Sequence, residues 1–249
     1  MRNPYDELYK QIDMIRRPFG YSPEYFMWRS SKIKRELAKF IGKNGLILDV
    51  GGGFGFMAKF LPDFFDVKNN YVNMDISIEM LKYSPYQNVL AAAERIPFRD
   101  SSFDYVIMSE VLEHVRDKVA ALKECYRILK KGGLFLLSTP RAGWIEDFRK
   151  SPFIVFLWAS SVINSFKSKL GVRGGCQFIV PEGVVDEPSD EEWLRKTLEE
   201  IGFKVLKQYR ADNHVPWSNS GESIFWRWFS DLFVNPSRFG HCTIVICTK

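Results

Sequence analysis

The chain has 249 residues, of which 46% are hydrophobic and 26% are charged, and it carries a formal net charge of +5. This composition is that of an ordinary globular protein and argues against a disordered chain, and the length fits a single core with insertions. The charge permits an anionic partner, but the sequence lacks the concentrated basic footprint of most nucleic-acid-binding proteins. Aromatic residues form 15% of the chain, which fits either a core rich in Phe or an apolar pocket or membrane-facing surface.

The cysteines and the apolar runs limit the class of protein further. Cys125, Cys176, Cys242 and Cys247 form no CxxC pair, and no His lies at the spacing of a zinc ligand. The first ten residues are polar and lack the apolar region of a signal peptide. No apolar run reaches the roughly 18–20 residues that span a bilayer. These features predict a cytoplasmic protein without a metal site.

In chain order, the first segment is a polar and aromatic stretch over residues 1–20, in which Pro4 and Pro18 break any long helix. Residues 22–24 then give a serine N-cap followed by proline at the first helical position. Apolar residues follow at three- and four-residue steps. This spacing predicts one amphipathic helix that ends near Gly42.

Short apolar runs then alternate with helical patterns along the rest of the chain. The expected strands lie at 46–50, 71–74, 87–91, 103–108, 134–138, 203–206 and 243–247, and the expected helices lie at 55–61, 78–83, 118–129 and 189–201. The basic pair Lys130 and Lys131 suits the C-terminus of the third of these helices. The alternation predicts an α/β fold with a Rossmann-like, doubly wound, seven-stranded sheet that is mostly parallel, with the last strand antiparallel.

We expect one domain with four parts. They are an N-terminal helical cap at 1–44, a cofactor-binding core at 45–140, an insertion or lid at 141–188, and the C-terminal part of the sheet at 189–249 with a second insertion at 211–238. Both insertions are rich in aromatic residues. They either pack on the sheet, cover an apolar or lipid-like substrate, or contact a membrane surface through 152–166 or 224–234.

The strongest local signal is the sequence DVGGGFG at 49–55, in which Gly51, Gly53 and Gly55 alternate directly after a strand. Glycines at this bend leave room for a ligand that lies across the strand end, and they permit a positive φ. Asp75 ends the next expected strand. A carboxylate there can accept hydrogen bonds from both hydroxyls of an adenosine ribose.

The same turn distinguishes between two adenosine cofactors. A nicotinamide enzyme would have the pattern GxGxxG, but Phe56 occupies its third glycine position. Asp49, just before the turn, would repel a pyrophosphate. It could instead orient the amino-acid end of S-adenosylmethionine (SAM) through backbone amides or water. The turn therefore favours SAM over NAD.

Four ordered motifs resemble those of class I SAM-dependent methyltransferases, in the type 11 subgroup that includes ubiquinone and menaquinone biosynthesis enzymes. They are DVGGGFG at 49–55, AERIPF and DSSFDYV within 93–106, SEVLEHV at 109–115 and RILKKGG at 127–133. The resemblance covers about residues 45–140. Motifs of this kind are specific for the fold and the cofactor, and they say little about the substrate.

The resemblance implies roles for the residues that match the motifs. The backbones of Gly51 and Gly53 would line the carboxypropyl end of SAM, within the turn that Gly55 closes. Asp75 would hold the ribose hydroxyls, and Ile76 would pack on the adenine.

The adenine edge and the amino group of SAM have their own implied partners. The backbone at Ala93, with Glu94 beside it, would read the adenine edge, and the carbonyl of Ser109 would face the amino group. Many relatives have an Asp where this sequence has Ala92. Adenine recognition would then depend on backbone groups or water.

Methyl transfer from a sulfonium is an in-line displacement, so much of the catalysis can come from holding the two reacting atoms collinear. A base is needed only if the acceptor atom carries a proton with a high pKa. His114 is the first candidate for that base, with a capping or core role as the alternative, and His214 is the second; His241 fits a structural role. We predict a methyltransferase acting on a small-molecule or lipid-like acceptor. A non-catalytic SAM-binding relative and an RNA or protein methyltransferase remain alternatives.

Overall fold

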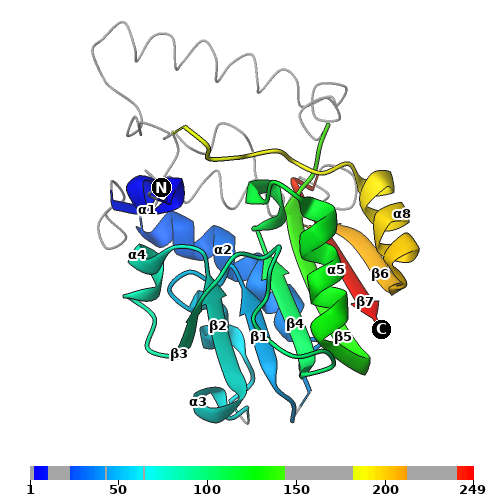
Figure 1. Ribbon diagram of the computed structural model, residues 1–249, viewed down its shortest axis with the longest axis horizontal. Coiled ribbons are helices and arrows are strands. Elements are labelled where there is room, and N and C mark those ends of the chain that lie inside the picture. The colour runs from blue at the N-terminus through cyan, green and yellow to red at the C-terminus, as the bar shows by residue number, and fades with distance from the viewer. Residues whose placement is uncertain (1–2, 11–22, 43, 64, 144–181, 212–239) are drawn as a thin grey trace, which may run out of the picture.

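The computed structural model describes residues 3–10, 23–42, 44–63, 65–143, 182–211 and 240–249 (Figure 1). Most of the two predicted insertions, and His214 with them, lie outside these residues. Within the described part of the chain, no helix combines the length and the apolar character needed to cross a membrane.

Seven strands form one sheet in the order β3-β2-β1-β4-β5-β7-β6. They are β1 Ile47–Val50, β2 Tyr71–Asp75, β3 Gln87–Leu90, β4 Phe103–Ser109, β5 Leu129–Pro140, β6 Lys204–Ala211 and β7 Cys242–Thr248. The pairs from β3 to β5 are all parallel, whereas β7 runs antiparallel to both β5 and β6. The predicted fold, a mostly parallel seven-stranded sheet with the last strand antiparallel, is confirmed.

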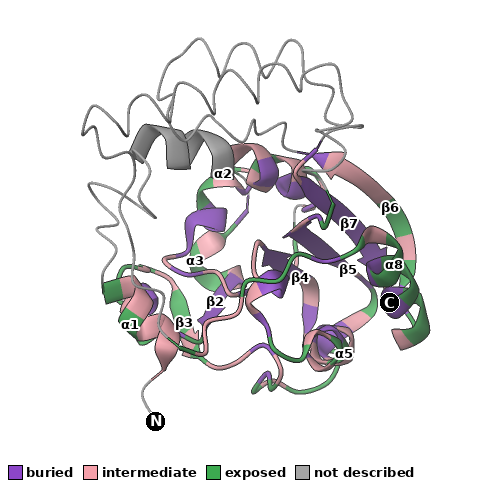
Figure 2. Ribbon diagram, turned by 90° about the horizontal axis from the view of Figure 1, so that it is seen from above, coloured by how far each residue is buried: buried purple, intermediate pink, exposed green. Residues whose placement is uncertain are grey.

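Helices cover the two faces of this sheet. They are α1 Pro4–Lys10, α2 Pro23–Ala38, α3 Val67–Asn70, α4 Ile78–Leu81, α5 Lys118–Ile128 and α8 Glu191–Ile201, together with the 3-10 helices η2 Phe56–Phe60 and η3 Leu112–His114. Figure 2 shows α2 and α5 on opposite sides of the buried strands. Leu37 of α2 and Met57 of η2 pack in one apolar cluster, and Leu122 of α5 and Leu198 of α8 pack in the other.

The order of the strands fixes where a ligand can bind. The chain builds β2 and β3 on one side of β1, and β4 and β5 on the other. In an open parallel sheet, the loops after two such neighbouring strands diverge and leave a crevice at their carboxyl ends. Residues 51–55 and the segment that follows Ser109 therefore lie side by side at this crevice, where Gly51 packs against Val111.

Two expectations about helices are corrected by the structure. Residues 4–10 form the short helix α1, which agrees with the expectation that Pro4 and Pro18 prevent a long helix. The second helix ends at Ala38 and not near Gly42. Lys130 and Lys131 belong to β5 and do not cap α5. The reason is that Leu129 pairs with Phe103 of β4, so the chain leaves the helix one residue before the basic pair.

Arg127, in the last turn of α5, ties the loop before β4 to the helix. Its guanidinium donates to the carbonyl oxygens of Ile96 at 2.9 Å and Phe98 at 2.8 Å. It also pairs with Glu124, whose Oε2 accepts from the backbone N–H of Ile96 at 2.8 Å. This network gives the two motifs that it joins a structural role, because the side chain of Arg127 satisfies two carbonyl groups of the loop.

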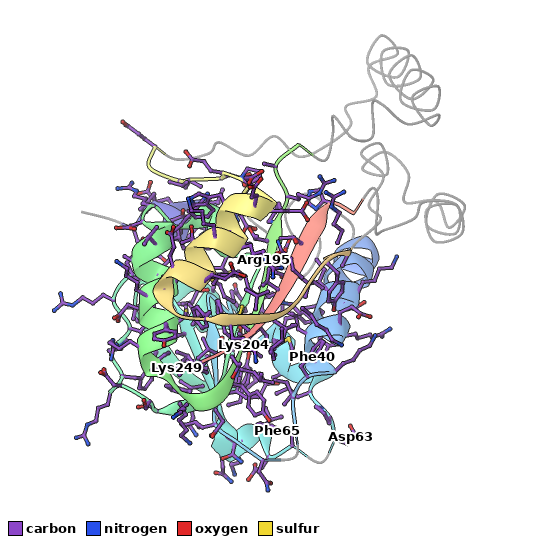
Figure 3. All side chains as sticks on the ribbon, turned by 90° about the vertical axis from the view of Figure 1, so that its right-hand side faces the viewer. Phe40, Asp63, Phe65, Arg195, Lys204 and Lys249 are labelled. Atoms are coloured by element: carbon purple, nitrogen blue, oxygen red, sulfur yellow. The ribbon has the colours of Figure 1, made fainter. Side chains whose placement is uncertain are left out.

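Arg127→Lys should lower the free energy of unfolding by about 1–2 kcal/mol. One ammonium group cannot donate to both carbonyl oxygens and also keep the ion pair with the carboxylate of Glu124. Urea denaturation measures the change. The control is Arg195→Lys on the surface of α8 (Figure 3), where Arg195 pairs with Glu199 at 3.1 Å and both side chains are about half exposed. An exposed pair of this kind contributes at most about 0.5 kcal/mol. Equal losses in the two variants would show that the Arg127 network is not stabilising.

Candidate cofactor site

The glycine turn after β1 is held in a backbone conformation that glycine alone adopts easily. Gly51, Gly53 and Gly55 have φ values of 70°, 58° and 78°, all in the left-handed region. The N–H of Gly51 donates to the carbonyl oxygen of Met74 at 2.7 Å, which anchors the turn to β2. The positive φ values are therefore the first reason why these positions require glycine.

The missing side chains of this turn make room for protein neighbours. A Cβ on Gly51 would overlap the methyl groups of Val111, and a Cβ on Gly55 would lie 2.5 Å from Tyr86 Cδ2. A Cβ on Gly53 would lie 3.0 Å from Met80 Cε. We expected these positions to be open toward a ligand. The structure adds a second requirement, since the turn packs tightly against the residues behind it.

Asp75, at the end of β2, is held by two backbone amides. Its Oδ2 accepts from Gly53 N–H at 2.9 Å and its Oδ1 accepts from Ser77 N–H at 2.8 Å. Only 7% of the residue is exposed, and this burial raises the pKa of the carboxyl group to about 6. The two hydrogen bonds fix the carboxylate in one orientation at the edge of the crevice.

Asp49 lies beneath the turn. It is 2% exposed, and its Oδ2 accepts a hydrogen bond from the hydroxyl of Tyr71. Burial raises the pKa of Asp49, with Lys34 and the Tyr71 hydrogen bond acting in the opposite direction. A Cβ on Gly52 would lie 2.6 Å from Asp49 Oδ2, so the carboxylate supports the turn from below. Its predicted role toward SAM stays a prediction.

A cavity of about 970 Å³ opens at this edge of the sheet. The described residues that line it are Asn3, Pro4, Tyr5, Glu7, Tyr9, Gly51, Met74, Asp75, Ile76, Ala91, Ala92, Ala93, Glu94, Glu110, Val111, His114, Val115, Arg116, Glu182 and Gly183. Six of the predicted site residues lie in its wall, namely Gly51, Asp75, Ile76, Ala93, Glu94 and His114. Cavities of this size hold small molecules.

Four predicted residues do not line the cavity: Asp49, Gly53, Gly55 and Ser109. The hydroxyl of Ser109 is buried and lies 3.0 Å from that of Ser138 on β5. Gly53 reaches the cavity only through the hydrogen bond that it donates to Asp75. Their cofactor roles stay predictions.

Residues 4–10 belong to the N-terminal helical cap that the sequence predicts at 1–44, and in the structure they form α1, in the wall of the cavity. The start of this helix has a local signal, because Asn3 before Pro4 is an N-cap followed by proline at the first helical position. In the structure, the Oδ1 of Asn3 accepts from the N–H of Tyr5 at 3.1 Å. The sequence did not predict which residues of the cavity α1 contacts, since these contacts join it to residues far along the chain.

His114 is held in one tautomer by its surroundings. Its Nδ1 lies 2.8 Å from the carbonyl oxygen of Val185, and because a carbonyl can only accept, Nδ1 carries the proton. Nε2 then has a free lone pair and lies 3.9 Å from Oε1 of Glu113. Burial, and after it the charge of Glu110, raises the pKa of Glu113 well above its usual range.

The residues of the cavity fit SAM. Asp75 presents a carboxylate whose position is fixed by two N–H groups, as a ribose diol requires. The neighbouring Ile76 is 42% exposed and offers an apolar surface for a flat ring. The small residues at 91–93 lie in the same wall.

Solved structures of other proteins share this fold. A Haloferax volcanii chain solved in complex with the Trm112 methyltransferase activator superposes with a TM-score of 0.59 at 16% identity, covering 90% of this chain and 91% of that chain. An S-adenosylmethionine-dependent methyltransferase from Mesorhizobium loti gives a TM-score of 0.56 at 15% identity, covering 86% of this chain and 96% of that chain. At these identities the likeness concerns the fold alone.

The sequence comparisons define the class. Residues 48–137 match the family model of the methyltransferase domain. A protein of Rickettsia akari is 30% identical over 216 residues, which cover 80% of this chain and 82% of that protein. The chain belongs to the class I SAM-dependent methyltransferases, and SAM is its cofactor.

The relatives point to one group within this class. The Rickettsia akari protein is a ubiquinone/menaquinone biosynthesis C-methyltransferase UbiE. The protein of the same name from Geotalea daltonii is 28% identical over 232 residues, covering 88% of this chain and 94% of that protein. This similarity agrees with the subgroup that the four motifs resemble.

Proposed function

We propose that the protein transfers the methyl group of SAM to a small-molecule or lipid-like acceptor, with a hydroquinone ring carbon as the first candidate. The observation that carries the proposal is the extent of the cavity. It continues from the residues assigned to the adenosyl group to Tyr5, Glu110 and His114. This second part of the cavity is available to bind the methyl acceptor. The names of the quinone-biosynthesis relatives support the same class of acceptor.

The bound SAM supplies an electrophilic methyl group on a sulfonium sulfur. Asp75 and Ile76 would orient the adenosyl part, and the backbone near Gly51 would hold the amino-acid part. Methylation of a ring carbon releases one proton from the acceptor. His114 is the residue best suited to accept it, since its Nε2 has no proton of its own when Nδ1 donates to Val185.

His114→Asn should lower the rate of methyl transfer at least about 100-fold, because it removes the base. Asn is chosen because its side-chain amide can still donate a hydrogen bond to the carbonyl oxygen of Val185. The affinity for SAM should stay within about twofold, since the change leaves the walls of the adenosyl part intact. The measurement follows labelled methyl from SAM into a short-chain prenylated hydroquinone, with SAM binding measured by calorimetry. A variant with the wild-type rate would assign His114 a structural role.

One experiment separates the acceptor classes. The protein is incubated with SAM labelled in the methyl group and with cell extract fractionated into lipids, small molecules, RNA and protein. Label in the lipid or small-molecule fraction supports the proposal, and label confined to RNA or protein contradicts it. SAM binding without transfer to any fraction would favour the non-catalytic alternative.

A further inference from the structure

The helix α1 forms one wall of the cavity, yet none of its residues is buried. It has seven residues, and an isolated helix in water needs about 12–15 residues even to be marginally stable. Contacts with the rest of the described chain must therefore hold it in place. Figure 1 shows α1 directly above α4.

The carboxylate of Asp6 makes the central contact. Its Oδ1 accepts from the hydroxyl of Ser77 at 2.6 Å and from the N–H of Glu79 at 3.3 Å. Ser77 is fully buried, and its own N–H donates to Asp75 Oδ1 at 2.8 Å. A continuous path of hydrogen bonds thus joins α1 to the carboxylate in the cavity wall.

Two further contacts hold the same helix. The hydroxyl of Tyr5 donates to the carbonyl oxygen of His114 at 2.6 Å and accepts from the N–H of Val185 at 3.2 Å. The side-chain amide of Asn3 donates to the carbonyl oxygen of Ile76 at 2.5 Å. The bond from Asn3 is exposed and the bonds to Tyr5 and Asp6 are partly buried, so opening of the helix lets water replace them, at a cost that is largest for the buried hydroxyl of Ser77.

We propose that α1 is a clasp that closes over bound SAM, and that Asp6 is the positioning residue that couples closure to Asp75. A seven-residue helix with no buried residue, joined to the rest of the fold by long-range hydrogen bonds, can open at a lower free energy than the whole fold. A ligand that contacts both Asp75 and the inner side of α1, at Tyr5 and Tyr9, shifts the balance toward the closed form. The inference rests on SAM as the cofactor and goes beyond the proposed acceptor.

Two measurements on the whole protein test this clasp, with S-adenosylhomocysteine as the probe. Hydrogen–deuterium exchange of the amides of residues 8–10 should slow about tenfold or more when the probe is bound. The dissociation rate of the probe, measured by stopped-flow fluorescence, should rise about tenfold in Asp6→Ala, which loses a charge-assisted hydrogen bond. Asp6→Asn should recover most of this loss, because its amide oxygen can still accept from Ser77.

The control is Lys10→Ala on the same helix. The Nζ of Lys10 lies 3.9 Å from Oε1 of Glu79, and its side chain is 57% exposed, so its removal should leave the dissociation rate unchanged. Equal exchange of amides 8–10 with and without the probe would overturn the clasp. So would equal dissociation rates in Asp6→Ala and Lys10→Ala. A lower unfolding midpoint of the unliganded Asp6→Ala than of Lys10→Ala would make Asp6 a plain structural residue.

The readouts need no methyl acceptor. A failed search for the acceptor would leave the exchange and dissociation results intact. Failure of the clasp and failure of the proposed function are therefore distinguishable.

Discussion

Gly51→Ala should lose both stability and SAM affinity. Its φ of 70° costs an L-residue about 1–2 kcal/mol. The added methyl group would overlap the side chain of Val111, and overpacking of this kind typically costs about 1–3 kcal/mol. We expect the free energy of unfolding to fall by about 2–5 kcal/mol, measured by urea denaturation, and the shifted turn to abolish SAM binding measured by calorimetry.

Gly132→Ala provides the matched control. Gly132 has a φ of 77°, and a Cβ there would meet no atom within 4 Å. This variant isolates the backbone cost of about 1–2 kcal/mol and should bind SAM normally. If both variants lost the same stability and both bound SAM, tight packing at Gly51 would have no role in the site.

SAM affinity should depend on pH through Asp75. Burial raises the pKa of this carboxyl group from 3.8 to about 6 in the unliganded protein. A ribose diol donates to the ionised form, so binding must compete with protonation below that pH. We expect the affinity to be level above about pH 7 and to fall by up to about tenfold per pH unit below about pH 6. Calorimetric titrations between pH 5 and 8 measure the profile.

The stability of the unliganded protein should change in the opposite direction. The pKa of Asp75 is higher in the folded chain than its ordinary value of 3.8. Its contribution to stability is therefore fully present below about pH 4 and is lost as the pH rises through about 6. Bound SAM offsets this loss, so the gain in melting temperature on adding SAM should be larger at pH 7.5 than at pH 5.

Two variants isolate Asp75 from the other titrating groups of the cavity. Asp75→Asn should bind SAM about 10–100-fold more weakly at pH 7.5 and should show a flat profile between pH 5 and 7, because its side chain does not titrate. His114→Asn should keep the sloping profile of the wild type. A slope that persisted in Asp75→Asn and vanished in His114→Asn would transfer the pH dependence to His114.

The local pattern of residues was enough to predict the sheet. Short apolar runs such as 46–50 and 103–108 are too brief for core helices, and their alternation with amphipathic segments leaves a parallel sheet as the simplest way to bury both. The starts of the helices expected at 78–83 and 189–201 were predicted to within two residues, since capping by Ser77 and Asp190 involves only the next two or three residues. The structure does not test the predicted cytoplasmic location or the predicted membrane-facing surfaces, so both stay predictions.

The sequence by itself determined the glycine turn after the first strand and the carboxylate of Asp75 at the end of the next one, because these features depend on backbone conformation and on neighbouring residues in the chain. Only the tertiary structure decided what else surrounds the cavity. Tyr5 meets His114 and Val185 across 109 and 180 positions of the chain, and Asp6 meets Ser77 across 71. No local pattern encodes such contacts. They form only when the folded sheet brings the ends of its strands together, because the segments that follow these ends are what α1 binds.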